Sequence, residues 1–142
     1  MNCSQVMTEN PVCCLPTDSV SHAAHLMRRS DVQVLPVVSN WHSNKLVGII
    51  TDRDLALRVV AEALDAETTS VAKVMTTIVM ACRADDDLSS AIGAMQEDRL
   101  NCLPILDDRD CVVGVLSRSD LDMRVGEVER VPRMFGRIRQ AA

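Results

Sequence analysis

The sequence is almost free of aromatic residues: Trp41 and Phe135 make up 1% of its 142 residues, and there is no tyrosine. A core of this composition has to be aliphatic. A stacking platform for single-stranded nucleic acid needs exposed rings, so this class of protein is excluded. The net charge of −5 also argues against binding a phosphate backbone. We therefore expect no nucleic-acid partner.

Long apolar runs are also missing. The longest, such as Val112 to Leu116, fall far short of the roughly 20 residues that a membrane-spanning helix needs. The first residues, Met1 to Gln5, lack the basic and apolar blocks of a signal peptide. Hydrophobic residues make up 47% and charged residues 25%, a balance typical of a globular domain. We expect a cytoplasmic protein with no membrane partner.

The six cysteines form no Cys-x-x-Cys pair, and no cysteine–histidine spacing is typical of a zinc site. They lie at positions 3, 13, 14, 82, 102 and 111. Without an export signal, we expect reduced thiols that act as small apolar side chains, and no essential metal. A thiol-based redox sensor at Cys13 or Cys14 is the alternative.

What the sequence does contain is an internal repeat. Val6-Met7-Thr8 recurs 68 positions later as Val74-Met75-Thr76, and the segment Gly48 to Leu55 aligns with Gly114 to Leu121 at an offset of 66. An ordered series of matches through both halves indicates two copies of one unit. The boundaries we assign are 2–62 for the first repeat, 63–73 for a linker, 74–127 for the second repeat and 128–142 for a C-terminal tail.

Each repeat is expected to fold as helix, strand, strand, helix, with an N-terminal segment that joins its own sheet. The apolar stripes at helical spacing are Val20, Ala23, Ala24, Met27 and Leu88, Ala91, Ile92, Met95. The expected strands are Val34–Val38, Leu46–Ile50, Cys102–Leu106 and Val112–Leu116. The second helices would bury Leu55, Val59, Leu121 and Val125. This predicts an α+β fold of two repeats that bury their sheet faces against each other around a pseudo-twofold axis.

Finer expectations concern the ends of these elements. Thr17-Asp18 and Asp85-Asp86 stand where helix N-caps are wanted, and Ser70 can cap a short helix toward Met75. Pro36 and Pro104 fall near the start of a strand. Because proline donates no ladder hydrogen bond, we expect edge positions or sheet entries there.

The two strand-to-helix turns contain the residues that suggest chemistry. Each has a glycine, two aliphatic residues, a hydroxyl residue (Thr51 or Ser117) and an aspartate three positions later (Asp54 or Asp120). The free N–H groups and the hydroxyl at such a turn suit a phosphate, and a carboxylate suits the 2′ and 3′ hydroxyls of ribose. Arg53 and Arg118 are candidate counter-charges. Taken singly, each turn is also an ordinary N-cap with a first-turn acid, which would contribute little to the stability of the free protein.

The whole pattern resembles a tandem pair of CBS domains, the cystathionine-β-synthase-type repeat or Bateman module. Val6-Met7-Thr8, Leu35-Pro36-Val37, Gly48 to Asp54 and their counterparts carry the resemblance, which covers about residues 2–127. The layout is similar to stand-alone bacterial members of the hypoxic-response type. The resemblance implies a regulatory, signal-transducing module that binds AMP, ADP, ATP, NAD or S-adenosylmethionine in clefts between the repeats, and often a disk-like homodimer.

The resemblance also implies which residues would bind. The hydroxyl–aspartate pairs map onto Thr51, Asp54, Ser117 and Asp120. Base-lining positions map onto Pro11, Val12, Leu35, Pro36 for one cleft and Ile78, Val79, Leu103, Pro104 for the other. Because the clefts are shared across the pseudo-twofold axis, lining residues can exchange between them. Outward-facing helices would form the dimer interface, with Met27 and Met95 reaching it.

Other functions have weaker support. His22 and His25 on a helix and His42 between two strands are the candidates for acid–base chemistry, but no nucleophile elbow, P-loop or HExxH motif is present. We therefore expect no enzyme. A structural protein that binds partners through its surface, with empty clefts, is the alternative. The arginine-rich tail is either solvated or a contact for a partner through Met134 and Phe135. We also expect an effector protein as a partner of a regulatory module.

Overall fold

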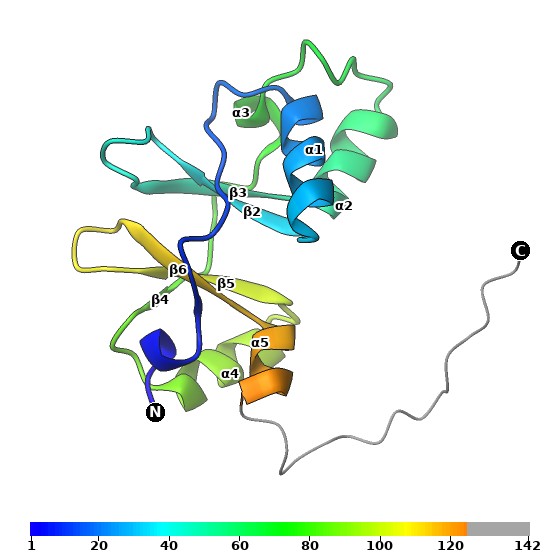
Figure 1. Ribbon diagram of the computed structural model, residues 1–142. Coiled ribbons are helices and arrows are strands. Elements are labelled where there is room, and N and C mark those ends of the chain that lie inside the picture. The colour runs from blue at the N-terminus through cyan, green and yellow to red at the C-terminus, as the bar shows by residue number, and fades with distance from the viewer. Residues whose placement is uncertain (125–142) are drawn as a thin grey trace, which may run out of the picture.

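The computed structural model describes residues 1–124, and both repeats have the expected order of elements (Figure 1). The first repeat contains α1 (Val20–Ser30), β2 (Val34–Val38), β3 (Leu46–Thr51) and α2 (Asp52–Leu55), which continues as a π-helical turn, Ala56–Val60. The second contains α4 (Leu88–Glu97), β5 (Cys102–Leu106), β6 (Val112–Ser117) and α5 (Arg118–Arg124). The fold class and all four expected strands are confirmed, β3 and β6 being one residue longer than expected.

The N-terminal segment pairs with the sheet of the second repeat, whereas we expected it to join the sheet of the first. The strands of the larger sheet follow the order β1-β6-β5-β4, where β1 is Thr8–Glu9 and β4 is Cys82–Arg83, while β2 and β3 form a separate antiparallel hairpin. Thr8 lies opposite Val115 of β6, so the segment joins the sheet of the second repeat. In return, Thr76 bridges to Ile49 of β3. The two repeats exchange the segments that precede them.

The exchange also defines the cores. The first core packs α1 and the β2–β3 hairpin against Val71 and Val74 of α3 (Val71–Val74), although α3 begins at the end of the assigned linker and leads into the second repeat. The second core packs α4 and the β5–β6 hairpin against Cys3 and Val6 of the N-terminal segment. Both are aliphatic, as the composition predicts. Covering each hairpin therefore requires chain from the other half of the sequence.

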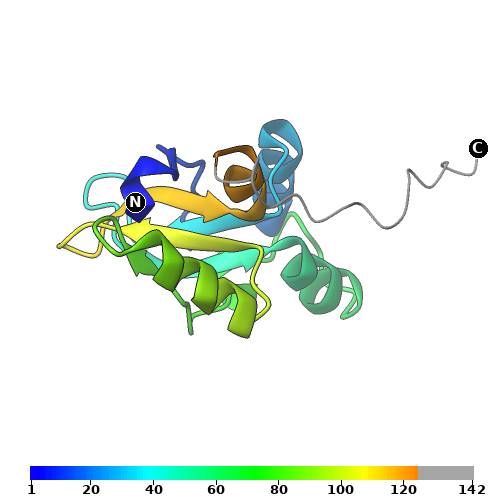
Figure 2. The same cartoon turned by 90° about the horizontal axis from the view of Figure 1, so that it is seen from below.

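Between the two hairpins lies a third, smaller cluster. Cys13, Val38, Leu106 and Val112 are buried there, where the sheets face each other. The loop beyond β2 and the loop beyond β5 are joined directly, since Leu46 N donates to Asp110 O and Val112 N donates to Asn44 O. Figures 1 and 2 show the helices on the outer sides of the paired hairpins. The expected burial of sheet faces between the repeats is confirmed.

Several expected details are wrong by one or two residues. The N-caps are Ser19 and Asp87, each one residue after the expected pair. Asp18 instead accepts a hydrogen bond from Leu15 N, which closes the turn before the helix. Ala24 is exposed, and Leu26 packs against the first core in its place, because the buried stripe is centred on Ala23. Ser70 does precede the helix α3, but without a side-chain cap.

The two prolines lie in the middle of their strands, not near the start. Pro36 is the third residue of β2, and its carbonyl accepts a hydrogen bond from Cys14 N. Cys14 O accepts from Val38 N, so the parallel segment pairs with β2 only on one side of Pro36. Because the segment does not pair at the proline nitrogen, the missing N–H costs no ladder bond. Pro104 holds the same position in β5, just beyond the short pairing with β4.

In the described part of the chain, no helix combines the length and apolar character needed to cross a bilayer. Val125, which we expected to face inward, and the tail with Met134 and Phe135 lie outside the described residues.

Candidate functional site

Each strand-to-helix turn is held by two reciprocal hydrogen bonds. In the first repeat, Thr51 N donates to Asp54 Oδ2 at 3.0 Å and Asp54 N donates to Thr51 Oγ1 at 3.0 Å. In the second repeat, Ser117 N donates to Asp120 Oδ2 at 3.0 Å and Asp120 N donates to Ser117 Oγ at 3.1 Å. Such a capping box satisfies donors that a helix start leaves free. It also places the hydroxyl and carboxylate of each motif side by side.

A threonine from the exchanged segment completes each carboxylate site. Thr8 Oγ1 donates to Asp120 Oδ1 at 2.9 Å, across 112 positions of sequence. Thr76 Oγ1 lies 3.3 Å from Asp54 Oδ1 and 3.4 Å from Asp54 Oδ2. Our sequence reasoning missed both threonines as site residues. The signal was present, because they end the repeated Val-Met-Thr triplets at matching positions.

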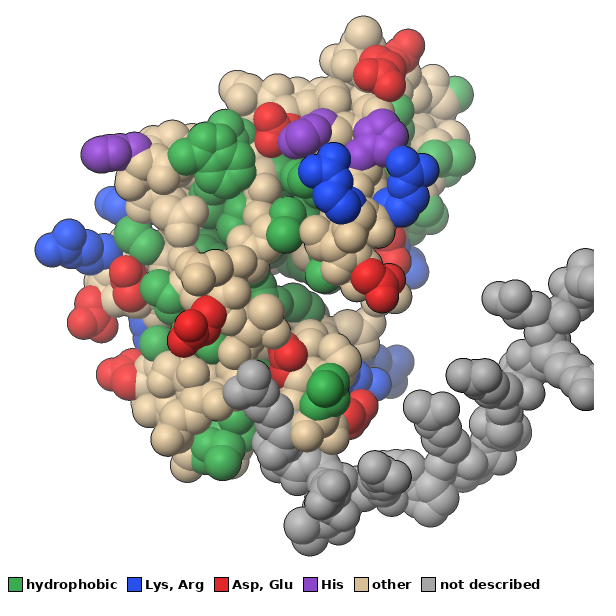
Figure 3. Space-filling model, in the orientation of Figure 1, with side chains coloured by type: hydrophobic (Ala, Val, Ile, Leu, Met, Phe, Trp, Pro, Cys, Tyr) green, Lys and Arg blue, Asp and Glu red, His purple; other side chains and the backbone are tan. Residues whose placement is uncertain are grey.

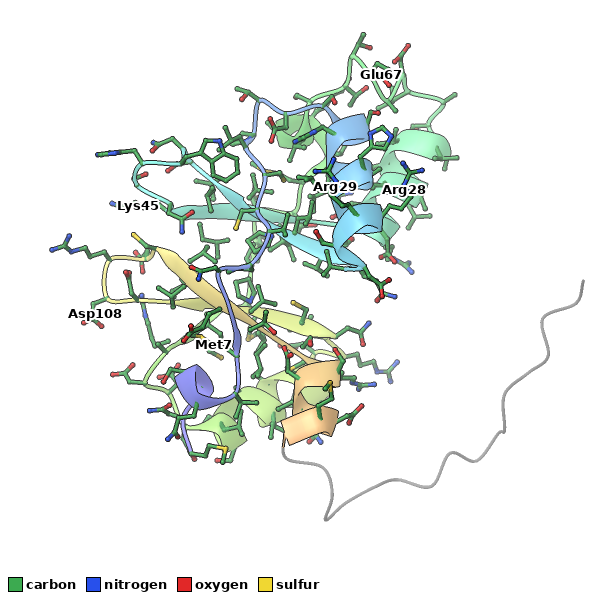
Figure 4. All side chains as sticks on the ribbon, viewed as in Figure 1. Met7, Arg28, Arg29, Lys45, Glu67 and Asp108 are labelled. Carbon is green, nitrogen blue, oxygen red and sulfur yellow. The ribbon has the colours of Figure 1, made fainter. Side chains whose placement is uncertain are left out.

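The glycine of each motif makes room for that threonine. A Cβ atom at Gly48 would lie 2.9 Å from Met75 Sδ and 2.9 Å from Thr76 O. A Cβ atom at Gly114 would lie 2.8 Å from Met7 Cγ and 3.0 Å from Thr8 O. Figure 4 shows Met7 among the side chains of the second repeat. The glycines therefore permit the close approach of backbones that brings each threonine to its aspartate.

A cavity of about 680 Å³ lies between the repeats, and one of the two motifs opens into it. Figure 3 shows the surface hollowed between the upper and lower halves. The second repeat contributes Ser117, Arg118 and Asp120 to the lining. The first repeat contributes three other predicted site residues: Pro11, Val12 and Pro36. Residues of both repeats therefore line this cavity.

Two predicted base-lining residues lie elsewhere. Leu35 and Leu103 are fully buried in the first and second cores. Successive side chains of a strand point to opposite faces, so the residues before them, Val34 and Cys102, line the cavity instead. Of the four base-lining residues that we assigned to these two strands, only Pro36 is among the described residues that line this cavity.

The remaining predicted residues do not line this cavity. Asp54 is only 8% exposed, and Arg58 Nε lies 3.8 Å from its Oδ1 while Arg58 Nη1 donates to Val74 O at 3.2 Å. Arg53 is exposed to solvent, and Ile78 is 93% exposed. Thr51, Val79 and Pro104 are also absent from the lining. The structure thus gathers one set of predicted residues around a cavity and leaves the other set dispersed.

The other candidate chemistries have less structural support. Burial raises the pKa of the Cys13 thiol to about 11 and, with a smaller effect of Asp18, that of Cys14 to about 12. Thiolates at these positions are therefore scarce near neutral pH, which disfavours a redox sensor there. His22, His25 and His42 are exposed. Residues 1–124 contain no group of three histidine, cysteine or acidic side chains arranged to hold a metal ion.

Comparison with protein families gives two matches along the chain. The model described as CBS domain matches residues 3–61 and again residues 71–127. YhcV of Bacillus subtilis, a CBS domain-containing protein, is 33% identical over 81% of this chain and 79% of its own length. Other relatives, 30–33% identical, are much longer, and the match covers only 21–24% of their length.

Solved structures with the same fold include other tandem pairs. The CBS domain pair of protein MJ0100, in complex with 5′-methylthioadenosine and S-adenosyl-L-methionine, has a TM-score of 0.79 at 24% identity and covers 91% of this chain and 98% of its own. Hypoxic Response Protein I, with two coordinated zinc ions, has a TM-score of 0.78 at 21% identity and covers 87% and 98%. The expected likeness to the hypoxic-response type is confirmed for the fold.

Proposed function

The chain belongs to the CBS-domain family, as a tandem pair, and from this premise we propose that it is a regulatory module that binds an adenosine-containing ligand in the cavity between its repeats. The carrying observation is the lining itself, where apolar residues of one repeat face the hydroxyl–aspartate motif of the other. The volume of about 680 Å³ lies within the usual range for small-molecule sites, roughly 300–1,000 Å³. The ligand complex of MJ0100 supports the same class of ligand.

The roles follow from the chemistry of each side chain. Among residues 1–124, Asp120 Oδ1 accepts one hydrogen bond, from Thr8, and a carboxylate oxygen has acceptor capacity for a second, from a ribose hydroxyl. Arg118 lines the same cavity and offers donors to further oxygen atoms of the ligand, while the hydroxyl of Ser117 donates to Asp120 Oδ2 at 2.8 Å and holds that carboxylate in place. Pro11, Val12 and Pro36 provide an apolar surface against which a base can pack. None of these proposed roles is catalytic, and we propose no enzymatic activity.

We propose one ligand per chain. Asp54, the counterpart of Asp120, is already paired with Arg58 and Thr76 and is almost fully buried. Filling a second site there would first require these contacts to break. The motif with Asp120 needs no such rearrangement, because it already lines a cavity.

The direct experiment is mass spectrometry of small molecules released when the purified protein is denatured. It is followed by calorimetric titration with adenosine, AMP, ADP, ATP, NAD and S-adenosylmethionine. A ligand at 100 times its Kd should stabilise the fold by about 2.7 kcal/mol. For a domain of this size, the melting temperature should rise by about 5 °C. Absence of binding by all of these compounds would contradict the proposal and favour a structural protein with empty clefts.

We further propose a cytoplasmic homodimer whose ligand state is read by an effector protein. Met27 and Met95, which we expected at the dimer interface, are buried in the cores at 7% and 2% exposure. The exposed apolar residues on the second helices, Leu57 at 50% and Met123 at 84%, are better candidates because they occupy matching positions in the two repeats. Light scattering after size exclusion tests this, and a mass near 15.6 kDa at micromolar concentration would contradict it.

A further inference from the structure

Both repeats contribute a carboxylate to the cavity. Asp120 comes from the turn before α5, and Asp31 comes from the end of α1 in the other repeat. Asp31 is the C-cap residue of α1, with φ of 53°, and its backbone N–H donates to Met27 O. Asp31 is exposed, so its carboxylate is open to a ligand that enters the cavity.

The charge of the lining is negative overall. In the part of the chain that the structure describes, the charged lining residues are Asp31, Asp120 and Arg118, which is two carboxylates against one guanidinium. Within residues 1–124, no ion pair includes Asp31 or Arg118. The other polar lining residues are neutral: Thr8, Asn10, Ser30, Gln33, Asn101, Ser117 and Ser119.

Such a lining is unsuited to a phosphate group. A cavity of about 680 Å³ is about 11 Å across, which is comparable with the screening length of about 8 Å at physiological salt, so each carboxylate acts on a large part of the cavity. A phosphate would meet repulsion from two charges and attraction from one. Adenosine with a neutral or cationic substituent avoids that repulsion. A positively charged substituent gains from both carboxylates.

The carboxylate at position 31 is not demanded by the backbone. The matching residue of the second repeat is Arg99, which has nearly the same φ, 54°, at the end of α4. A left-handed residue is therefore required at this helix end, but its charge is free to vary. The acid at position 31 is a feature of this cavity and not of the fold.

We propose that Asp31 is a specificity-determining residue that makes the cavity select adenosine compounds without phosphate, neutral or cationic at the 5′ position, over AMP, ADP and ATP. The proposal rests on the proposed function, because it concerns the same cavity. It divides the candidate ligands into two groups by charge.

The test is calorimetric titration of the wild-type protein with adenosine, 5′-methylthioadenosine, S-adenosylmethionine, AMP and ATP, at low salt where exposed charges are least screened. The wild type should bind the best compound without phosphate at least tenfold more tightly than AMP. Asp31→Asn keeps the shape and suits a left-handed residue, and it should reduce this ratio severalfold. Asp31→Arg, which copies position 99, should reduce it further or reverse it.

Arg99→Asn is the matched control, because it also introduces asparagine at the equivalent helix end, but outside the cavity. The ratio of its affinity for the best compound without phosphate to its affinity for AMP should equal that of the wild type. Thermal melts establish that each variant is folded. Binding of AMP at least as tight as that of adenosine, or an unchanged ratio in Asp31→Asn, overturns the assignment of Asp31 and leaves the proposed function standing. Failure of every compound to bind the wild type would overturn the proposed function itself.

Discussion

The two strand-to-helix turns have the same hydrogen-bonded backbone and opposite surroundings. Asp54 is 8% exposed, contacts Thr76 and pairs with Arg58, whereas Asp120 is half-buried, contacts Thr8 and lines the cavity. A duplicated motif therefore does not imply a duplicated site. The capping box and the threonine belong to the architecture of both repeats. Only the surroundings of the carboxylate decide whether a ligand can reach it.

The largest expected difference between the two aspartates is in ligand affinity. Asp120→Ala removes charge-assisted hydrogen bonds worth roughly 1.5–3 kcal/mol, so affinity should fall about tenfold to a hundredfold. Asp54→Ala should change affinity less than about threefold, because Asp54 does not line the cavity. Calorimetric titration of both variants with the tightest ligand of the wild type measures this. Equal losses in the two variants would refute the one-ligand proposal.

The loss of stability should be larger for Asp54→Ala than for Asp120→Ala, which is the opposite of the order expected for ligand affinity. From the sequence we expected an exposed acid whose loss is nearly neutral, but Asp54 is buried and accepts from Thr51 N while it pairs with Arg58. Its removal leaves these donors without their acceptor, and we expect Asp54→Ala to lower the free energy of unfolding by about 2 kcal/mol. Asp120→Ala should cost about half as much, because water can reach the site. Urea unfolding of the ligand-free variants tests the order.

The repeat explains why so much of the fold was predictable from the sequence. Strands Val34–Val38 and Cys102–Leu106 agree residue by residue with expectation, since each is a short apolar run bounded by polar residues and confirmed by its copy. Local pattern cannot reveal that Thr8 pairs with Val115, 107 positions later, because the same apolar residues could cover either hairpin. The exchange is decided by the packing of the whole chain.

The same limit applies to the site. The motif residues Ser117 and Asp120 could be found from spacing alone, and the structure places them together. Asp54 is closed off because the side chain of Arg58, one helical turn away, lies against it. The repeat pattern does not encode the orientation of Arg58. Our sequence reasoning missed Asp31 as a cavity residue. A helix commonly ends on a residue in the left-handed conformation, which Asp31 adopts, so an aspartate at this place does not by itself indicate a binding site.

The close approach at the two motif glycines offers a contrast with Gly93. An added Cβ atom would lie 2.9 Å from Thr76 O at Gly48 and 3.0 Å from Thr8 O at Gly114, and at Gly114 it would also lie 2.8 Å from Cγ of the buried Met7. Gly48→Ala and Gly114→Ala should therefore each destabilise the protein by about 1–2 kcal/mol. Thermal denaturation measures the stability difference. Gly93→Ala is the control, since a Cβ atom there meets nothing within 4 Å.

Alkaline pH should distinguish the cysteines at matching positions of the repeats. Burial raises the pKa of Cys14 from 9.0 to about 12, and it also raises that of the half-buried Cys82. Because the thiol ionises more readily in the unfolded chain, its contribution to stability is complete below pH 9 and is lost as pH rises toward 12. The slope contributed by Cys14 is at most about 1.4 kcal/mol per pH unit.

Urea midpoints at several pH values between 8 and 10.5 measure that slope. Cys14→Ala should flatten it more than Cys82→Ala, which serves as the matched variant in the other repeat. A slope that is the same in the wild type and in Cys14→Ala would show that the thiol ionises equally well in the folded protein. The same protein preparation, denatured, should titrate as six free thiols, in agreement with the free cysteines of the structure.

The smallest expected difference is at the N-caps of the first helices. Ser19 Oγ accepts a hydrogen bond from His22 N at 3.0 Å, whereas Asp87 makes no side-chain cap to its helix and accepts instead from Ser89 Oγ. Ser19→Ala should cost about 1 kcal/mol of unfolding free energy, because the N–H of His22 loses its acceptor. Asp87→Ala should cost less than about 0.5 kcal/mol, since it removes an exposed hydrogen bond from Ser89 Oγ and the favourable interaction of a carboxylate with the helix dipole. Added salt screens that interaction and should reduce the cost of Asp87→Ala further, while leaving that of Ser19→Ala unchanged. Equal costs for the two variants at low and high salt would mean that both helices are capped in the same way in solution.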